Sequence, residues 1–163
     1  MELAIISDTH LPKGARTLPA ACISRLASAD LILHAGDFVG IEVLREIEAL
    51  GPPLAAVHGN VDTAEVRAVL PERRVVEAGG ARIGMVHDAG PAQGRLARLQ
   101  KQFPDTDAVV FGHSHMPLRE RNEHGFQIFN PGSPTDRRRE PSHTVGLARV
   151  RARKLTFEHV ALD

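Results

Sequence analysis

Two histidines separated by a single residue, His113 and His115, follow a short apolar run in the second half of the chain. The run, residues 107–111, has the composition of a buried strand, and Gly112 allows the backbone to turn sharply after it. Neutral imidazole is the commonest metal ligand among side chains, and burying two imidazoles without a partner costs free energy. A pair of solvated loop histidines is the simpler interpretation of this stretch alone, so the choice depends on the residues at the ends of the other strands.

Four other apolar runs end in residues that could also bind a metal. Each run is predicted to be a strand, and its end carries a carboxylate, a carboxamide or a histidine. These residues are Asp8 and His10 after residues 2–6, Asp37 after 30–34, Asn60 after 54–58, and His87 after 82–86. Ligands bind outside the carboxyl ends of the strands in open α/β sheets. Five strand ends therefore predict one shared site.

The types of these side chains indicate which ions they would hold. A mixture of imidazoles and carboxylates suits Mn, Fe, Zn, Ni or Co better than calcium or magnesium. Seven candidate ligands are too many for one such ion, but they suit two ions that share a bridging carboxylate. Two ions about 3.5–4 Å apart can clamp the attacking and leaving oxygens of an in-line displacement at phosphorus. The ligand set therefore predicts phosphoryl chemistry.

The elements that must position these residues are predicted from hydrophobic periodicity and turn residues. Helices are expected at 18–27, 41–50, 63–70 and 91–103. Hairpins are expected to pair 73–78 with 82–86 and 117–122 with 126–129, and two last strands, 144–151 and 154–160, are expected to close the sheet. Helices alternate with the first strands and hairpins dominate later, so we expect an α/β fold with two stacked sheets flanked by helices.

Several local expectations accompany this fold. Asp8 and His10 should project to one side of an extended segment, and Asp62 should cap the following helix. Asn60 has a plain turn residue as its alternative interpretation, since Gly-Asn is common in turns. His34 lies inside a strand and is expected to be a structural, hydrogen-bonded histidine. Expected surface histidines are His124, His143 and His159, and Cys22 is expected in the core.

Composition limits the function classes that need consideration. The 163 residues are predicted to form a single domain, 1–163, and twenty basic residues balance twenty acidic ones. No global charge therefore draws the chain to nucleic acid or to an anionic membrane, and Trp and Tyr are absent. No basic leader precedes the first strand, no apolar run approaches a membrane span, and the single cysteine fits a reducing compartment. We expect a cytoplasmic location and no membrane partner.

Five short motifs, taken together, resemble those of the calcineurin-like metallophosphoesterase superfamily in order and approximate spacing. They are Asp8-x-His10, Gly36-Asp37, Gly59-Asn60, Gly84-x-x-His87 and Gly112-His113-x-His115. The chain is most similar to the small bacterial and archaeal phosphodiesterase branch, and the resemblance extends through residues 130–133 to the closing strands. It implies a four-layer α-β-β-α sandwich of two mixed sheets flanked by helices, the metallo-dependent phosphatase fold.

The resemblance also implies how the ligands are divided between two divalent transition-metal ions. The ligands of one ion would be Asp8, His10 and His115, and those of the other Asn60, His87 and His113. Asp37 would bridge the two ions together with a water or hydroxide that attacks phosphorus. The expected metal is manganese, with nickel, iron, zinc and cobalt as alternatives. The residues expected to act in catalysis are Asp37, Asn60 and His113.

One position departs from the family pattern, and one loop has an open role. Many members have a histidine after Gly-Asn that assists the leaving group. This chain has Val61 at that position. Small members of the family often lack the histidine too. General-acid help is worth about 10²–10⁴-fold, so we expect slow turnover that favours leaving groups needing no proton. Substrate binding is assigned to Asn60 and to Arg137, whose guanidinium could orient a phosphate. The alternative for the basic run 137–139 is a solvated loop.

The leading hypothesis is a dinuclear-metal phosphodiesterase acting on a small phosphodiester. A phosphomonoesterase, or a hydrolase of another phosphorus ester, is the alternative among enzymes. A non-catalytic interaction scaffold is the alternative from another class, because the fold also serves in eukaryotic membrane-trafficking coats. That alternative predicts eroded ligands, whereas all seven are present. Neutral charge and scarce aromatic residues disfavour a nucleic-acid-binding module. The oligomeric state stays open, a homo-oligomer included.

Overall fold

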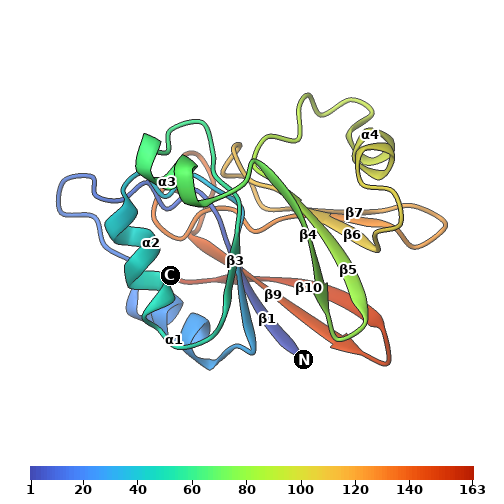
Figure 1. Cartoon of the computed structure of the whole chain (residues 1–163), viewed down its shortest axis with the longest axis horizontal. Helices are drawn as coiled ribbons and strands as arrows, with labels where there is room; N and C mark the ends of the chain where they lie inside the picture. Colours follow the sequence, from blue (N-terminus) through green and yellow to red (C-terminus); the bar gives the residue numbers. More distant parts are fainter.

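The computed structural model describes residues 1–163 and contains ten strands and four helices (Figure 1). The strands are β1 (Glu2–Ile6), β2 (Leu31–His34), β3 (Leu54–Ala56), β4 (Arg73–Ala78), β5 (Ala81–Val86), β6 (Ala108–Val110), β7 (Leu118–Arg121), β8 (Gln127–Asn130), β9 (Thr144–Arg151) and β10 (Lys154–Ala161). The helices are α1 (Ala20–Ser28), α2 (Ile41–Glu48), α3 (Ala64–Val69) and α4 (Arg95–Gln102).

The strands form two mixed five-stranded sheets, in the orders β10-β9-β1-β2-β3 and β4-β5-β6-β8-β7. β1, β2 and β3 are parallel, as are β5, β6 and β8, whereas β4, β7, β9 and β10 run antiparallel to their neighbours. The predicted α/β fold with two mixed sheets flanked by helices is confirmed.

The side chains of β1 show why the sheets stack in this way. Leu3 and Ile5 point into the core between the two sheets, whereas Ala4 and Ile6 pack on the opposite face with residues of α1 and α2. A strand buried on both faces has a continuous apolar sequence, and each buried Leu or Ile contributes about 1.5–3 kcal/mol. On the outer face of the second sheet, Leu99 of α4 packs over β6 and β8. The layers are therefore helix, sheet, sheet and helix.

The carboxyl ends of the parallel strands of both sheets meet at one edge of the sandwich. In Figure 1, β1 starts near the N-terminus at the bottom of the view and runs upward toward the loops beside α3. Hydrogen bonds cross between the loops at this edge: Gly112 N–H donates to His87 O (2.9 Å), and His113 N–H donates to an Asp8 oxygen (3.0 Å). The segments that follow β1, β2, β3, β5 and β6 therefore share one region.

Most predicted elements are confirmed, with shifted boundaries. The helix predicted over 91–103 begins only at Arg95, because Gly94 precedes it with a φ of 68° in the left-handed region. The strand predicted over 54–58 ends at Ala56. Cys22 is fully buried, as expected, and burial raises the pKa of its thiol to about 12 despite the lowering effect of Arg25.

One surface assignment was wrong. The ring of His159 is half-buried and stacks on Phe129 with a centroid distance of 4.4 Å, and its Nε2 donates to the Asn130 carbonyl (2.7 Å). Because β10 lies over the end of β8, the His159 ring is covered by Phe129 and by the Asn130 carbonyl of β8. No helix of the structure is both long and apolar enough to cross a bilayer.

Candidate metal centre

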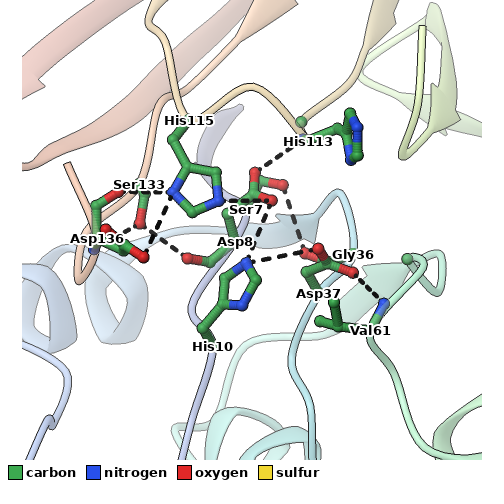
Figure 2. Close-up of polar contacts among 12 residues, drawn as sticks. Ser7, Asp8, His10, Gly36, Asp37, Val61, His113, His115, Ser133 and Asp136 are labelled. Atoms are coloured by element: carbon green, nitrogen blue, oxygen red, sulfur yellow. Dashed lines mark hydrogen bonds and ion pairs between the residues drawn. The ribbon is translucent and has the colours of Figure 1, made fainter. Parts of the chain in front are cut away.

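All seven predicted ligands lie together at the carboxyl edge of the two sheets. Six of them form two triads whose ligand atoms lie within 4.8 Å of one another, namely Asp8, His10 and His115 in the first and Asp37, His87 and His113 in the second. Figure 2 shows the rings of His10 and His115 directed toward the Asp8 and Asp37 carboxylates. The seventh, Asn60, places its Oδ1 3.1 Å from both His87 Nε2 and His113 Nδ1. Asn60 therefore belongs with the second triad.

The backbone at Asp8 and His10 is not the extended segment that was expected, and left-handed residues recur among the seven. Five of the seven have positive φ, namely Asp8 (57°), His10 (46°), Asp37 (62°), His113 (71°) and His115 (62°). A left-handed residue other than glycine costs about 1–3 kcal/mol and persists only where its surroundings enforce it. In each pair, Asp8 with His10 and His113 with His115, two left-handed residues flank one residue without positive φ, Thr9 or Ser114. Such strain is concentrated at functional sites.

The first triad contains three buried polar atoms without a hydrogen-bond partner: Asp8 Oδ1, His10 Nε2 and His115 Nε2. Asp8 Oδ1 lies 3.7 Å from His10 Nε2 and 3.5 Å from His115 Nε2. The other Asp8 oxygen accepts from His113 N–H, which orients the carboxylate. An unsatisfied buried polar atom costs about 1–3 kcal/mol, so three in one cluster need a common partner. One transition-metal cation fits this set of a carboxylate and two imidazoles.

Asp37 belongs to the second triad and also faces the first. Its Oδ2 is 3.5 Å from His10 Nε2 and 3.1 Å from His87 Nε2, whereas Asp8 Oδ1 is farther from both atoms, at 3.7 and 3.9 Å. Its Oδ1 accepts from Val61 N–H (3.0 Å). Burial acts to raise the pKa of Asp37, but the hydrogen bond and charge of His87 and the Val61 N–H outweigh it, so the pKa is lowered. Asp37 is therefore held as a carboxylate whose Oδ2 faces histidines of both triads.

Backbone carbonyls fix the tautomers of two histidines. His87 Nδ1 contacts Ala35 O at 2.7 Å, and His115 Nδ1 contacts Asp136 O at 2.6 Å. A carbonyl oxygen only accepts, so each Nδ1 carries a proton and each Nε2 points into the cluster, where that of His115 has no hydrogen-bond partner and that of His87 lies 3.1 Å from Asp37 Oδ2. This arrangement is usual for metal-binding histidines, because the outer hydrogen bond sets the ring orientation.

The pKa values of these two histidines shift in opposite directions. Burial lowers the pKa of His115 below its ordinary value, although the charge of Asp8 partly offsets it. Burial also acts to lower the pKa of His87, but the hydrogen bond to Asp37 and the charges of Asp8 and Asp37 raise it overall. The surroundings of His115 thus favour its neutral, ligating form, whereas those of His87 favour its protonated form, which cannot ligate a cation.

Two glycines of the motifs are required because other groups approach closely. A Cβ at Gly59 would lie 2.0 Å from Asp37 Oδ1, and a Cβ at Gly112 would lie 1.9 Å from Ser7 Oγ. Neither glycine has positive φ, so the sharp turn expected at Gly112 does not depend on a left-handed conformation. A side chain at either position would displace the aspartate-bearing loops.

Asp62 does not cap α3, contrary to the prediction, and has a different role. The cap is Thr63, whose Oγ1 accepts from a backbone N–H of the first turn. Asp62 is only 6% exposed, and its two oxygens accept from the N–H groups of Asp37 (3.0 Å), Val39 (2.8 Å) and Gly59 (2.6 Å). It ties the loop after β2, where Val39 has a φ of 93°, to the loop after β3. Sequence spacing gave no indication of this contact.

Three polar residues after β8 support the first triad and were not predicted to do so. Asn130 Nδ2 donates to Gly112 O (3.0 Å), and Ser133 Oγ donates to Asp8 O (2.8 Å). Thr135 Oγ1 donates to Thr9 O (2.6 Å). A polar residue at the end of an apolar strand was the available indication for Asn130. The same pattern had identified the ligands.

His34 is a structural histidine, as predicted. Its Nδ1 accepts from Gly36 N–H (3.1 Å), so its Nε2 carries the proton and donates to Thr9 Oγ1 (3.2 Å). The ring stacks on Phe38 at a centroid distance of 3.5 Å, and burial holds the pKa of His34 well below its ordinary value. A neutral imidazole therefore links the loops after β1 and β2 from behind the ligands.

Arg137 is not brought together with the ligands by any hydrogen bond or ion pair. Its side chain is exposed and donates to the carbonyl of Glu140 in its own loop. The neighbouring Arg138 is the arginine whose charge acts on His115. Substrate binding by Arg137 stays a prediction.

Comparison with known proteins supplies independent findings. A family model described as the calcineurin-like phosphoesterase superfamily domain matches residues 1–153. A probable metallophosphoesterase from Methanothermobacter thermautotrophicus is 34% identical over 162 residues, which cover 97% of this chain and 91% of that protein.

Two solved structures share the fold at lower identity. Vps29 (vacuolar protein sorting 29) from Entamoeba histolytica, complexed with zinc, has a TM-score of 0.78 at 23% identity and is covered completely, as is this chain. A novel archaeal phosphodiesterase has a TM-score of 0.75 at 23% identity, with 99% of both chains covered. One fold thus occurs in a sorting protein and in an enzyme, so function must be argued from the site.

Proposed function

The chain belongs to the calcineurin-like phosphoesterase superfamily, and we propose that it hydrolyses small phosphodiesters with two divalent metal ions. Membership of the family and the two candidate metal-binding triads support a metal-dependent phosphoesterase. The observation that carries the finer proposal is the position of Asp37 Oδ2, which lies 3.5 Å from a nitrogen of one triad and 3.1 Å from a nitrogen of the other. A carboxylate between two triads suits a bridging ligand.

In this proposal the residues divide between an inner ion, held by mostly buried side chains, and an outer ion, two of whose ligands are exposed. The residues of the inner ion are Asp8, His10 and His115, and those of the outer ion are Asn60, His87 and His113, with Asp37 shared. Two such cations would lower the pKa of water and stabilise negative charge on phosphoryl oxygens. Asn60 and His113 are exposed, so they are the members that can also contact a substrate oxygen. The Nδ1 hydrogen bonds of His87 and His115 keep their rings in place throughout.

Departure of the leaving group is the weak point of this site. Val61 occupies the position of the usual histidine, is 40% exposed, and contributes only its backbone N–H to Asp37. We expect the rate to fall steeply as the pKa of the leaving group rises, because nothing at this position donates a proton. A series of aryl phosphodiesters measures this dependence, and a flat line on a rate-limiting chemical step would contradict it.

Manganese is the metal we propose, and a cytoplasmic location is supported by the single cysteine, which fits a reducing compartment. A phosphomonoesterase and a non-catalytic scaffold like the Vps29 neighbours are the alternatives. The strained backbone at five of the seven candidate ligands argues against a scaffold, because such strain is usually retained where it serves a function.

The deciding experiment combines metal analysis with two substrates. The protein is reconstituted with Mn²⁺, and bis(p-nitrophenyl) phosphate and p-nitrophenyl phosphate are compared, with chelated protein as the control. We expect two bound ions per chain and a higher kcat/KM for the diester. Preference for the monoester favours the phosphomonoesterase alternative. Metal binding without turnover of either ester favours the scaffold, and turnover by metal-free protein rules out the mechanism.

A further inference from the structure

A polar cavity of about 190 Å³ adjoins the second triad. It lies between the end of β3, helix α3 with the loop that follows it, and the end of β5, and Val86 is its one apolar lining residue. Asn60 and His87 belong both to this cavity and to the proposed metal centre. A phosphoryl group held beside these two residues would therefore direct one of its substituents into the cavity.

The size of the cavity limits what it can hold. Pockets that take up a whole ligand usually measure roughly 300–1,000 Å³, so a cavity of about 190 Å³ suits one substituent of a diester rather than the complete substrate. It is open to solvent on its outer side, because Glu72 and Asp88 in its wall are exposed. The remaining substituent can lie outside it.

Some of the charged side chains that line the cavity have hydrogen-bond partners, and others do not. Arg67 donates from Nε to Asp62 O (3.0 Å) and from Nη2 to Asn60 O (2.9 Å), so its guanidinium braces the Asn60 loop. Glu72 has no hydrogen bond or ion pair through its side chain. Asp88 uses one oxygen to accept from Gly90 N–H (2.8 Å), which leaves the other oxygen open. Neither carboxylate pairs with Arg67.

Open carboxylate oxygens are acceptors, and they select for groups that donate. Hydroxyl groups donate to carboxylates without adding charge, whereas a nitrophenyl or alkyl group offers them no hydrogen-bond donor. A phosphate or carboxylate substituent would be repelled by Glu72 and Asp88. The lining therefore matches a small, polyhydroxylated substituent.

We propose that this cavity is a substrate subsite that receives a hydroxyl-bearing substituent, of the ribosyl or glyceryl kind, with Glu72 and Asp88 accepting its hydroxyl protons in hydrogen bonds. The inference rests on the proposed phosphodiesterase function and narrows its substrate class. Arg67 acts as a positioning residue here, since it holds the Asn60 loop that forms the wall shared with the metal centre.

The test uses diesters that share one leaving group. The p-nitrophenyl esters of glycerol phosphate, thymidine 5′-phosphate and methyl phosphate are compared on the Mn²⁺-loaded protein, with the methyl ester as the substrate that lacks hydroxyls. We expect KM to be about fivefold or more lower for a hydroxyl-bearing ester, as hydrogen bonds to charged groups imply. Comparison of the glyceryl ester with the thymidyl ester shows whether the cavity prefers a glyceryl or a sugar substituent. Equal KM values for all three esters would overturn the proposal.

The variant Glu72→Ala should remove this preference. It should raise KM for the preferred ester about fivefold and leave kcat, and KM for the methyl ester, unchanged. Glu77→Ala, which replaces an exposed glutamate of β4 outside this cavity, is the matched control and should change nothing. A Glu72→Ala variant with unchanged preference, or with equally raised KM for all esters, would contradict the assignment.

A binding measurement separates this inference from the proposed function. Calorimetry compares glycerol phosphate with methyl phosphate on the Mn²⁺-loaded wild-type protein and on Glu72→Ala. Tighter binding of glycerol phosphate that Glu72→Ala abolishes supports the subsite even where no diester is hydrolysed, in which case only the proposed function fails. Equal binding of both phosphates argues against the subsite even where diesters are hydrolysed.

Discussion

The two triads contain the same kinds of ligand but differ in burial and in hydrogen bonding. In the first triad the side chains of Asp8, His10 and His115 are 0%, 17% and 1% exposed, and each has a buried ligand atom without a partner. In the second triad His113 is exposed, and its Nδ1 lies within hydrogen-bonding distance of Asn60 Oδ1. The ligands of the second triad thus have polar partners within the protein.

This difference indicates unequal roles. A desolvated cluster without partners gains most from a cation, because the cation satisfies atoms that already bear the cost of burial. A cluster with internal hydrogen bonds must give them up when it binds a cation. We therefore expect the first triad to bind a cation tightly, and the second to bind one more weakly next to solvent, where a substrate could approach.

The largest effect is expected when the link between the triads is removed by Asp37→Asn. The variant keeps the shape but loses the charge of the oxygen that faces both triads. We expect kcat to fall about 10³-fold, the upper range for loss of one preorganised electrostatic group, and the Mn²⁺–Mn²⁺ coupling in the EPR spectrum to disappear. Asp105→Asn, an exposed aspartate with positive φ, is the control. Retained coupling in Asp37→Asn would exclude a bridging role.

A smaller effect is expected from Asp62→Asn, which weakens the tie between the loops after β2 and β3. Three backbone N–H groups lose charge-assisted acceptors, and at least one faces an amide N–H₂ instead. We expect metal affinity to fall about 10–100-fold, and more for the second ion than for the first. Calorimetric titration with Mn²⁺ measures both steps. An equal loss at both steps would show that Asp62 supports the whole edge.

Titration of the wild-type protein measures the difference between the triads directly. We expect two steps whose Kd values differ by about tenfold or more, since one unsatisfied buried atom accounts for about 1.4 kcal/mol. His115→Ala should abolish the tight step, and His113→Ala the weak one. A single step in the wild-type protein would refute the comparison, as would loss of the tight step in His113→Ala alone.

The smallest effect concerns His34, which supports the loops behind the ligands. Its pKa lies well below the ordinary value in the folded protein, so between that pKa and about 6.5 the unfolded chain binds more protons than the folded one. The free energy of unfolding should therefore decrease as the pH falls below about 6.5, by up to about 1.4 kcal/mol per pH unit. Urea unfolding of metal-free protein measures the slope.

The contribution of His34 is isolated by two variants. His34→Gln should reduce the slope below about pH 6.5, whereas His124→Gln, which replaces an exposed histidine, should leave it unchanged. An identical slope in wild type and His34→Gln would show that the other histidines account for the pH dependence.

The sequence was informative wherever a residue type and a short period determine the outcome. β1 and the hairpin β4–β5 were predicted within a residue, because continuous or alternating apolar residues and a Gly-Gly turn depend on local geometry. The seven candidate ligands could be predicted to lie together because each follows a predicted strand, and parallel strands share their carboxyl edge. His34 was identified as structural for the same local reason.

Other features depended on groups far apart in the chain. The role of Asp62 required the loops after β2 and β3 to be adjacent, and without that contact a helix cap was the reasonable interpretation. The burial of His159 depended on β10 folding over β8. The left-handed backbone at Asp8 and His10 is enforced by tertiary hydrogen bonds, such as that of Ser133, and not by local preference.

The sequence by itself thus determined where the strands lie, which polar residues follow each strand, and the chemical types of the candidate ligands. These features depend only on side-chain chemistry and hydrophobic period, which are properties of the chain. Only the tertiary structure decided which carboxylate oxygen faces the site, which histidine nitrogen carries its proton, and how much more deeply one triad is buried than the other. Hydrogen bonds between residues that are distant along the chain set all three, and sequence spacing does not encode those distances.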